Sequence, residues 1–249
     1  MKVTIITVAF NAAATIGKTL QSVARQTHAD IEHIVVDGAS TDGTQAIAKE
    51  SRWRVSKFVS ERDLGIYDAM NKGLTLASGD VVGFLNADDR YEDEDVLSRV
   101  TRVIEQESLD GVFGDAAYFK SEDPTRTIRR YRSVRFSARS IAWGWMPAHP
   151  ALFLRRSVYE RVGGFRTDYR IAGDYEFVAR AFTRAELKVR HIPEVLVRMQ
   201  TGGISTAGWR NTLLLNREVL RACRENGIST STLRILSKYP FKILERFRS

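Results

Sequence analysis

The sequence predicts an α/β fold with a mostly parallel, Rossmann-like sheet and helices on both of its faces. In the first half of the chain, short apolar runs alternate with longer amphipathic stretches, which is the pattern of repeated βα units. Several apolar runs end directly in acidic or glycine-containing turns, as strands do at the ligand-binding edge of such a sheet. Of the 249 residues, 43% are hydrophobic, an ordinary fraction for a globular protein with a buried core.

The individual elements follow from the local pattern. Apolar runs bounded by turn residues predict strands over residues 3–8, 34–37, 55–59 and 81–85. Helical periodicity predicts helices over about 14–25, 43–51 and 67–77, a further helix ending near 107, and short helical segments at 157–162 and 175–182. Beyond residue 124 the pattern is otherwise irregular and rich in arginine and aromatic residues.

The expected helix ends have recognisable chemistry. Thr41 or Asp42 can cap the helix that starts near residue 44, and Asp93 or Asp95 can cap the helix that ends near residue 107. The two glycines at 163–164 are typical of a helix that stops there. Capping is therefore an alternative explanation for several acidic residues.

Charge divides the chain into parts with different partners. Counting Lys and Arg against Asp and Glu, residues 1–123 carry −8 and residues 124–249 carry +16, for a total of +8. Residues 124–159 contain eight arginines and no acid, which indicates phosphate groups, an acidic lipid surface or nucleic acid as the partner. The expected units are 1–123, 124–210 and a basic C-terminal helical extension over 211–249.

Cysteine content and hydropathy indicate a cytoplasmic protein. Cys223 is the single cysteine, so an intramolecular disulfide and a cysteine-rich zinc site are excluded, and we expect it to be a buried apolar residue. No stretch reaches the roughly 20 apolar residues that span a bilayer, and the N-terminus has the pattern of a strand rather than of a signal peptide.

Two acidic strand ends carry the strongest chemical signal. The apolar run 81–85 leads into Asp88 and Asp89, and the run 34–36 leads into Asp37. Two adjacent carboxylates repel each other unless a cation or a ligand's donors lie between them, and a divalent metal is the simplest such cation. Because parallel strands bring their carboxyl ends to one edge, these acids are expected to form one site.

Five segments together resemble glycosyltransferase family 2, the inverting nucleotide-sugar-dependent transferases of the GT-A fold. The resemblance covers about residues 1–200. The segments occur in the family's order and spacing, at residues 5–11, 22–27, 36–44, 63–73 and 86–89. The resemblance implies a GT-A fold and transfer of a sugar from a nucleotide donor such as a UDP-, GDP- or dTDP-sugar.

For the acids after residue 81, the resemblance implies a metal site. Asp89 would be the ligand of Mg²⁺ or Mn²⁺, and Asp88 would contact the ribose of the donor or metal-bound water. Hard carboxylate oxygens suit either cation, which would offset the charge that grows on a diphosphate leaving group. A solvated acidic turn is the alternative.

The rest of the donor site is expected along the same edge. Asp37 is placed to accept hydrogen bonds from a base or ribose, although Gly38 stands where many family members have a second acid. An ordinary turn residue is the alternative for Asp37. The end of the first strand, Thr7, Val8 and Ala9, is expected to line the pocket, largely through backbone groups.

The segment 63–73 is expected beside the nucleotide. By resemblance, Asp63 and Gly65 form its approach, and Gly65 and Asp68 are assigned to donor binding. Asp68 and Lys72 lie four residues apart on an expected helix, so a surface ion pair is the alternative explanation for Asp68.

Inverting transfer needs a base that removes the proton of the acceptor hydroxyl. By resemblance the base is Asp174, at a position where the family usually has a Glu-Asp pair. Here Gly173 replaces the glutamate, and Glu176 is the second candidate. Asp174 could also be the N-cap of the helix that follows, where the helix N-terminus would fix its carboxylate and lower its pKa.

Trp145 and His149 are the candidates for acceptor contact, since aromatic faces stack on sugar rings and a histidine can contact phosphate. A core position for the tryptophan and a structural role for the histidine are the alternatives. The glycine-rich loop 201–205 could close over the donor. Cationic and apolar residues of the final segment predict a helix on an anionic membrane surface, and they include Arg234, Lys238, Lys242 and Arg246.

These observations predict a metal-dependent inverting glycosyltransferase that acts on a hydroxyl of a saccharide or a lipid-linked acceptor, in polysaccharide or glycolipid biosynthesis. The expected location is the cytoplasm, with peripheral contact at the inner face of the cell membrane. The alternatives are a nucleotidyltransferase of similar fold, a catalytically inactive homologue, and a basic nucleic-acid-binding protein. Nucleic acid is not the expected partner, because the acidic strand ends would repel a phosphate backbone.

Overall fold

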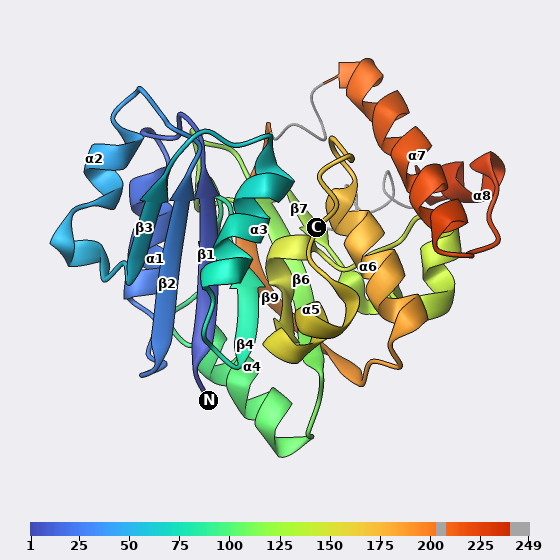
Figure 1. Ribbon diagram of the computed structural model, residues 1–249, viewed down its shortest axis with the longest axis horizontal. Helices are drawn as coiled ribbons and strands as arrows, with labels where there is room; N and C mark the ends of the chain where they lie inside the picture. Colours follow the sequence, from blue (N-terminus) through green and yellow to red (C-terminus); the bar gives the residue numbers. More distant parts are fainter. Residues whose placement is uncertain (203–207, 240–249) are drawn as a thin grey trace.

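A computed structural model describes residues 1–202 and 208–239, which form a nine-stranded sheet with helices on both faces (Figure 1). The strand order is β3-β2-β1-β4-β8-β6-β9-β5, and β7 pairs with β6. The first four strands on this path are parallel to one another and arise from the βα units of the first half. Their bounds are β1 Val3–Ala9, β2 Ile31–Asp37, β3 Lys57–Ser60 and β4 Val81–Phe84.

Beyond β4 the sheet is mixed. Antiparallel pairs join β8 (Leu152–Arg155) to β4 and to β6 (Gly111–Phe119), and join β7 (Arg129–Tyr131) to β6. The strand β9 (Val189–Gln200) runs parallel to β6, and β5 (Arg90–Tyr91) is antiparallel to β9. The α/β prediction is therefore confirmed, with the parallel order concentrated in the first half, where helical crossovers connect the strands.

The helices cover the sheet in two groups. On one face lie α1 (Ile16–Ala24), α2 (Thr44–Ala48) and α4 (Val96–Gln106), whose apolar side chains pack in two clusters with β1, β2 and β4. The near face in Figure 1 carries α3 (Ile66–Leu76), α5 (Arg156–Val162) and α6 (Gly173–Arg184) in one large cluster. Four short 3-10 helices are interspersed: η1 Ser51–Trp53, η2 Ser133–Arg135, η3 Ala138–Trp143 and η4 His149–Ala151.

Two further helices follow β9 and pack beyond α6, at the right of Figure 1. They are α7 (Gly208–Glu225) and α8 (Thr232–Leu236). Cys223 lies fully buried on α7, as expected. Residues 203–205 of the predicted closing loop, and Lys242 and Arg246 of the predicted membrane helix, lie outside the described residues. No described helix is long and apolar enough to cross a membrane.

Some predicted caps differ from the observed ones. The N-cap of α2 is Gly43, at φ 98°, although the Asp42 carboxylate does accept a hydrogen bond from the Thr44 N–H at 3.1 Å. Asp95 is at the N-cap of α4 but makes no side-chain capping bond. The N-cap of α6 is Ala172, so Asp174 lies inside the first turn and the capping alternative for Asp174 is wrong.

Candidate active site

The carboxyl edge of the parallel strands brings the acidic strand ends together. Ala9 at the end of β1 pairs with Asp37 at the end of β2, and the Ala9 carbonyl accepts the Gly38 N–H at 2.9 Å. On the other side of β1, the Leu85 N–H donates to the Ile6 carbonyl at 3.0 Å and extends the pairing with β4. Asp37 and the turn that carries Asp88 and Asp89 therefore flank the same strand end, as predicted.

The turn after β4 is held by backbone and side-chain contacts. The Asp89 N–H donates to the Asn86 carbonyl at 3.0 Å, and the Asn86 amide donates to the Asp89 carboxylate at 3.1 Å. From α1, the Thr19 hydroxyl donates to the Asp89 carbonyl at 2.7 Å. Thr19 precedes the motif 22–27, and no local pattern marked it as a support of this turn. These contacts fix the backbone of the turn, with the Asp89 carboxylate buried and the Asp88 carboxylate half-buried.

Asp88 and Asp89 form an electrostatically strained pair. Asp89 is 2% exposed, and burial together with the charge of Asp88 raises its pKa well above the ordinary value. Burial also raises the pKa of Asp88. No cationic side chain among the described residues contributes to the pKa of either group. A buried charge beside a half-buried like charge is costly when no cation is near, so a cation or hydrogen-bond donors of a ligand would relieve the strain.

The oxygen atoms of this turn fit a hard divalent cation. Besides the two carboxylates, the buried Asn86 Oδ1 has no hydrogen-bond partner in the described structure. The described residues contain no group of three or more metal-binding side chains. One or two carboxylates are nevertheless the usual protein share of a Mg²⁺ site that is completed by substrate phosphates and water.

Asp37 lies at the same edge as Asp89 but has more hydrogen-bond donors around its carboxylate. It is fully buried, and its carboxylate accepts hydrogen bonds from the Ser40 N–H at 2.9 Å, from the Ser40 hydroxyl and from the Ser60 hydroxyl at 2.7 Å. Ser60 is the last residue of β3. The Asp37 carboxylate therefore joins β2, β3 and the turn after β2. A ligand can bind only the lone pairs of its oxygens that Ser40 and Ser60 do not use.

The end of β1 is mostly closed. Thr7 is fully buried and its hydroxyl lies 3.0 Å from His33 Nε2, so its side chain is engaged inside the sheet. Val8 and Ala9 are buried as well, so the predicted contact of this strand end with a ligand would have to use backbone groups. Phe10, directly after the strand, is 66% exposed and presents an aromatic ring at this edge. No local pattern in the sequence marks Phe10 as a site residue.

Asp63 approaches the same edge from the loop before α3. A Cβ atom built on Gly38 would lie 2.5 Å from Asp63 Oδ2 and 3.3 Å from Phe10 Cδ2. Gly38 thus leaves room for a carboxylate that arrives from residue 63. A second acid is present at this point of the edge, although it does not follow Asp37 in the sequence.

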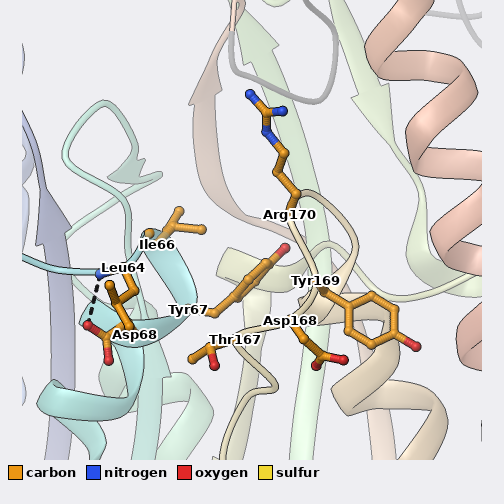
Figure 2. Close-up of a pocket in the computed structure, with 9 residues that line it drawn as sticks. Leu64, Ile66, Tyr67, Asp68, Thr167, Asp168, Tyr169 and Arg170 are labelled. Atoms are coloured by element: carbon orange, nitrogen blue, oxygen red, sulfur yellow. Dashed lines mark hydrogen bonds between the residues drawn. The ribbon is translucent and has the colours of Figure 1, made fainter.

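Gly65 and Asp68 lie at the start of α3. Gly65 is the N-cap, with φ 119°, a conformation that favours glycine. The Asp68 carboxylate accepts the Leu64 N–H at 3.0 Å and pairs with Lys72 at 3.4 Å, so the ion pair that was the alternative does form. Figure 2 shows Asp68 bonded to Leu64 beside a cavity of about 390 Å³ between this turn and the loop 167–170.

Asp174 lies in the first turn of α6 and is joined to α3 by Tyr67. The Tyr67 hydroxyl donates to the Ile171 carbonyl at 2.6 Å and lies 3.4 Å from Asp174 Oδ1. Burial raises the pKa of Asp174, while the His149 charge and the hydrogen bonds from Tyr175 and Tyr67 oppose that shift. A carboxylate with a raised pKa is a better proton acceptor, which suits a general base.

The ring of Tyr67 also explains Gly173. A Cβ atom at residue 173 would lie 2.7 Å from the Tyr67 ring, so any larger residue would displace the tyrosine. Tyr67 lies within the segment 63–73 on which the resemblance rested, but its contact spans more than a hundred positions along the chain. No local pattern in the sequence marks that contact.

His149 connects Asp174 to the strand that carries the acidic turn. Its ring stacks on Phe84, the last residue of β4, with centroids 5.5 Å apart, and meets Phe165 edge-on at 5.6 Å. The histidine is 8% exposed, and burial lowers its pKa while the charge of Asp174 opposes that shift. The histidine is thus a member of the aromatic core beside Asp174.

The remaining predicted residues have structural partners. Trp145 is 9% exposed, and the Arg135 guanidinium lies over its ring at 5.8 Å. Trp143 is the more exposed tryptophan, at 45%, and carries Arg234 at 5.5 Å. Glu176, the second candidate base, is buried in an ion pair with Arg180 at 3.0 Å. Asp174 is therefore the better placed of the two candidate bases.

The geometry has counterparts in known proteins. The sequence model described as "Glycosyl transferase family 2" matches residues 4–163. A "PGL/p-HBAD biosynthesis glycosyltransferase" of Mycobacterium tuberculosis is 34% identical over 210 residues, which cover 81% of this chain and 78% of that protein. A further glycosyltransferase of that species, described as uncharacterized, is 35% identical over 181 residues, or 72% of this chain and 68% of that protein.

Solved structures share the fold at low sequence identity. TarS of S. aureus, residues 1–349, superposes with a TM-score of 0.70 at 18% identity, covering 89% of this chain and 66% of that chain. The longer TarS structure gives a TM-score of 0.69, and the match covers 88% of this chain but only 39% of TarS. The mannosyltransferase PcManGT of Pyrobaculum calidifontis gives 0.62 at 22% identity, with 88% and 64% covered.

Proposed function

The chain belongs to glycosyl transferase family 2, and we propose that it is an inverting, metal-dependent enzyme that moves a sugar from a nucleoside diphosphate to an acceptor hydroxyl. The predicted GT-A glycosyltransferase is thereby confirmed at the level of family, fold and class of reaction. The alternatives of a nucleotidyltransferase and a nucleic-acid-binding protein gain no support. The substrates, the metal and the role of each residue are parts of the proposal.

One observation carries the proposal. The buried Asp89 and the half-buried Asp88 both have raised pKa values and no described cationic partner, at the edge where the parallel strands end. A divalent metal would supply the missing positive charge, and the diphosphate of the donor would supply further oxygen ligands for that metal. We assign metal binding to Asp89, and ribose or metal-bound water to Asp88. The Asn86 amide oxygen is a further oxygen donor of the same turn.

Several residues along the edge would hold the donor. Backbone groups of Thr7, Val8 and Ala9, the Asp37 carboxylate, Gly65 and Asp68 are assigned to the nucleotide sugar. TarS has been solved with UDP-GlcNAc, and PcManGT with GDP-Man and Mn²⁺, so uridine and guanosine donors are the first to test. When bound, Mg²⁺ or Mn²⁺ would offset the negative charge that develops on the diphosphate as the sugar leaves.

Asp174 is assigned to the proton transfer. Its carboxylate would accept the proton of the acceptor hydroxyl as that oxygen forms a bond to the anomeric carbon. The bond between the sugar and the diphosphate breaks in the same displacement, and the nucleoside diphosphate leaves with the electron pair. Tyr67 would hold the carboxylate in place through its hydroxyl, and His149 would support it from the aromatic cluster.

The acceptor is proposed to be a saccharide or lipid-linked hydroxyl compound. The relative of Mycobacterium tuberculosis is described as a PGL/p-HBAD biosynthesis glycosyltransferase, and residues 124–249 of this chain carry a charge of +16. Trp145 and His149 remain candidates for acceptor contact, and Trp143 offers more exposed ring. Contact with an anionic membrane from the cytoplasmic side fits the same charge.

The proposal is tested by thermal unfolding with UDP, GDP, dTDP and CMP, each with and without Mn²⁺. A ligand that binds the folded state raises the melting temperature by mass action. We expect a rise of several degrees with one diphosphate in the presence of Mn²⁺, and little rise in Asp89→Asn. Equal rises with and without Mn²⁺, or in both proteins, would refute the metal assignment. No rise with any nucleotide would refute the donor site.

A further inference from the structure

The amino end of α6 is held by a carboxylate from another helix. Glu218, in the middle of α7, is 8% exposed. It accepts hydrogen bonds from three successive backbone N–H groups, those of Arg170 at 2.8 Å, Ile171 at 2.9 Å and Ala172 at 2.8 Å. Hydrogen bonds from backbone N–H to a carboxylate are stronger than those between neutral groups. Glu218 therefore binds α7 firmly to the segment that precedes α6.

This contact adds an acceptor for the N–H of the N-cap residue of α6 and for the two N–H groups before it. The N-cap residue Ala172 has no side-chain acceptor, and α6 shows no side-chain capping bond. The unpaired N–H groups at the start of a helix carry partial positive charge, and an anion at this point offsets it. Glu218 supplies that anion from a residue 46 positions away, outside the segment that matches the family model.

The same segment is fixed from the opposite side by α3. Tyr67 donates its hydroxyl to the Ile171 carbonyl, and its ring fills the space beside Gly173. Ile171 is thus held through its N–H by Glu218 and through its carbonyl by Tyr67. Asp174 follows three residues later, so both contacts decide where its carboxylate points.

We propose that Glu218 is a positioning residue that caps α6 from α7 and offsets its positive end, which keeps Asp174 a competent base. The inference rests on the proposed function, in which Asp174 is the base. The groups that face Asp174 are His149 from η4, Tyr67 from α3 and Tyr175 from its own helix, with Glu218 behind the preceding segment. His149, the Tyr67 hydroxyl and the Tyr175 N–H all favour the ionised carboxylate. The negative charge of Glu218 at the start of α6 would act in the opposite direction, by offsetting the positive end of the helix.

The direct test is to measure the pKa of Asp174 by NMR titration of the carboxyl resonances in protein labelled with ¹³C at aspartate. The variant Asp174→Asn assigns the resonance. Glu218→Gln removes the charge and places an amide N–H₂ against backbone donors. We expect the pKa of Asp174 to fall by about 0.5 to 1 unit, because the helix end is no longer offset. Glu225→Gln on the same helix is the matched control, since Glu225 pairs with Arg166 and Arg221.

Kinetics provide the second measurement, with release of UDP from UDP-GlcNAc or of GDP from GDP-Man in Mn²⁺ as the probe. In Glu218→Gln we expect kcat to fall about tenfold with the donor KM within twofold, and the acid limb of the kcat profile to move to lower pH. Glu225→Gln should stay within twofold of wild type in both constants. A merely structural role would lower stability and leave the pH profile in place.

The outcomes separate the inference from the function on which it rests. An unchanged pKa of Asp174 in Glu218→Gln overturns the inference, whether or not the enzyme turns over. Absence of nucleotide release by wild type with both donors contradicts the proposed donors, while the NMR titration still decides the role of Glu218. Should Glu218→Gln not fold, Glu218→Asp takes its place. Because the aspartate side chain is shorter, we expect a smaller fall in the pKa of Asp174 in Glu218→Asp. An unchanged pKa would overturn the inference.

Discussion

The two ends of the parallel sheet treat buried carboxylates in opposite ways. At the amino end, Glu32 of β2 is 3% exposed and accepts hydrogen bonds from the Thr4 hydroxyl, the Ser78 N–H and hydroxyl, and Lys57. Burial by itself would raise the pKa of Glu32, but these bonds lower it to about 2. At the carboxyl end, burial raises the pKa of Asp88 and Asp89, and no described cation offsets it.

The difference distinguishes a structural carboxylate from one that awaits a ligand. Glu32 is saturated by the protein's own donors, so its charge stabilises the junction of β1, β2, β3 and the turn before β4. The Asp89 carboxylate accepts hydrogen bonds from the Asn86 amide and the Gln200 N–H, but these two bonds do not outweigh its burial and the charge of Asp88. A cation in a ligand would stabilise the acidic turn further. Glu32 and Asp89 are both carboxylates that are almost fully buried, so the number and charge of their hydrogen-bond partners decide the difference in their pKa.

The largest expected effect concerns the base at the carboxyl end. Asp174→Asn should lower kcat by about 10² to 10⁴, because the acceptor hydroxyl loses its proton acceptor. Nucleotide binding in Mn²⁺ should stay within twofold, which calorimetry can measure. A kcat near that of wild type would show that Asp174 is not the base. The carboxyl end of the sheet would then have one functional carboxylate fewer to set it apart from the amino end.

The kcat of wild type should also fall as the pH drops through the raised pKa of Asp174, which lies above the ordinary value of 3.8. Protonation removes the base, so the acid limb should lie higher than for a solvent-exposed aspartate. The measurement is kcat against pH at saturating donor, in buffers of constant ionic strength. An acid limb at or below pH 3.8 would contradict the assignment.

The next effect concerns stability at the amino end. Glu32→Gln should destabilise the protein by about 2 to 3 kcal/mol at pH 7, since Lys57 loses a buried partner and the donors around residue 32 lose acceptors. Because the folded pKa is lowered, this contribution is present above pH 4.5 and is lost as the pH falls toward 2. Urea unfolding at pH 7 and pH 3 should show the variant and wild type converging at the lower pH.

A smaller effect of opposite sign is expected for the acidic turn. Asp89→Asn should stabilise the metal-free protein by about 1 kcal/mol at pH 7, because the ionised form of a group with a raised pKa is the destabilising one. Glu122→Gln, at an exposed acid, is a control for the loss of one negative charge. A loss of stability in Asp89→Asn would mean that the protein itself satisfies this carboxylate.

The smallest expected changes in stability concern Asp68, and they test whether this residue contacts the donor. Breaking its ion pair with Lys72 should change stability by less than about 0.5 kcal/mol in Asp68→Asn. The same limit is expected for Lys72→Gln, which also removes the pair of Lys72 with the exposed Glu61 at 2.9 Å. If Asp68 contacts the donor, only Asp68→Asn should also weaken nucleotide binding, which titration calorimetry can resolve. Equal binding by both variants would leave Asp68 as a helix-start residue only.

The sequence predicted the parallel half well because its signals are local. Alternating apolar runs located β1 to β4, and the position of Asp88 and Asp89 directly after a strand located the acidic turn. Asp174 depended on the resemblance, since nothing around it is decisive alone. Insertion of β8 between β4 and β6 could not be predicted, because the irregular stretch after residue 124 carries no period that specifies a strand partner.

The supports of the site were missed for the same reason. Tyr67 reaches Asp174 across 107 positions and Glu218 reaches Ala172 across 46, and no local pattern encodes contacts at such separations. Glu32 lies outside the strand predicted over 34–37, and no local pattern singled it out; its partners from three other segments give it a role. The roles of side chains that act through tertiary contacts can be identified only from the three-dimensional structure.

The contrast between the two ends is tested most directly by the unfolding free energies of wild type, Glu32→Gln and Asp89→Asn, each alone and with Mn²⁺ and UDP or GDP. We predict opposite signs without ligand, with Glu32→Gln less stable and Asp89→Asn more stable than wild type. Added metal and nucleotide should stabilise wild type and Glu32→Gln but not Asp89→Asn. Destabilisation of the same sign in both variants, with stabilisation by ligand retained in Asp89→Asn, would contradict the account.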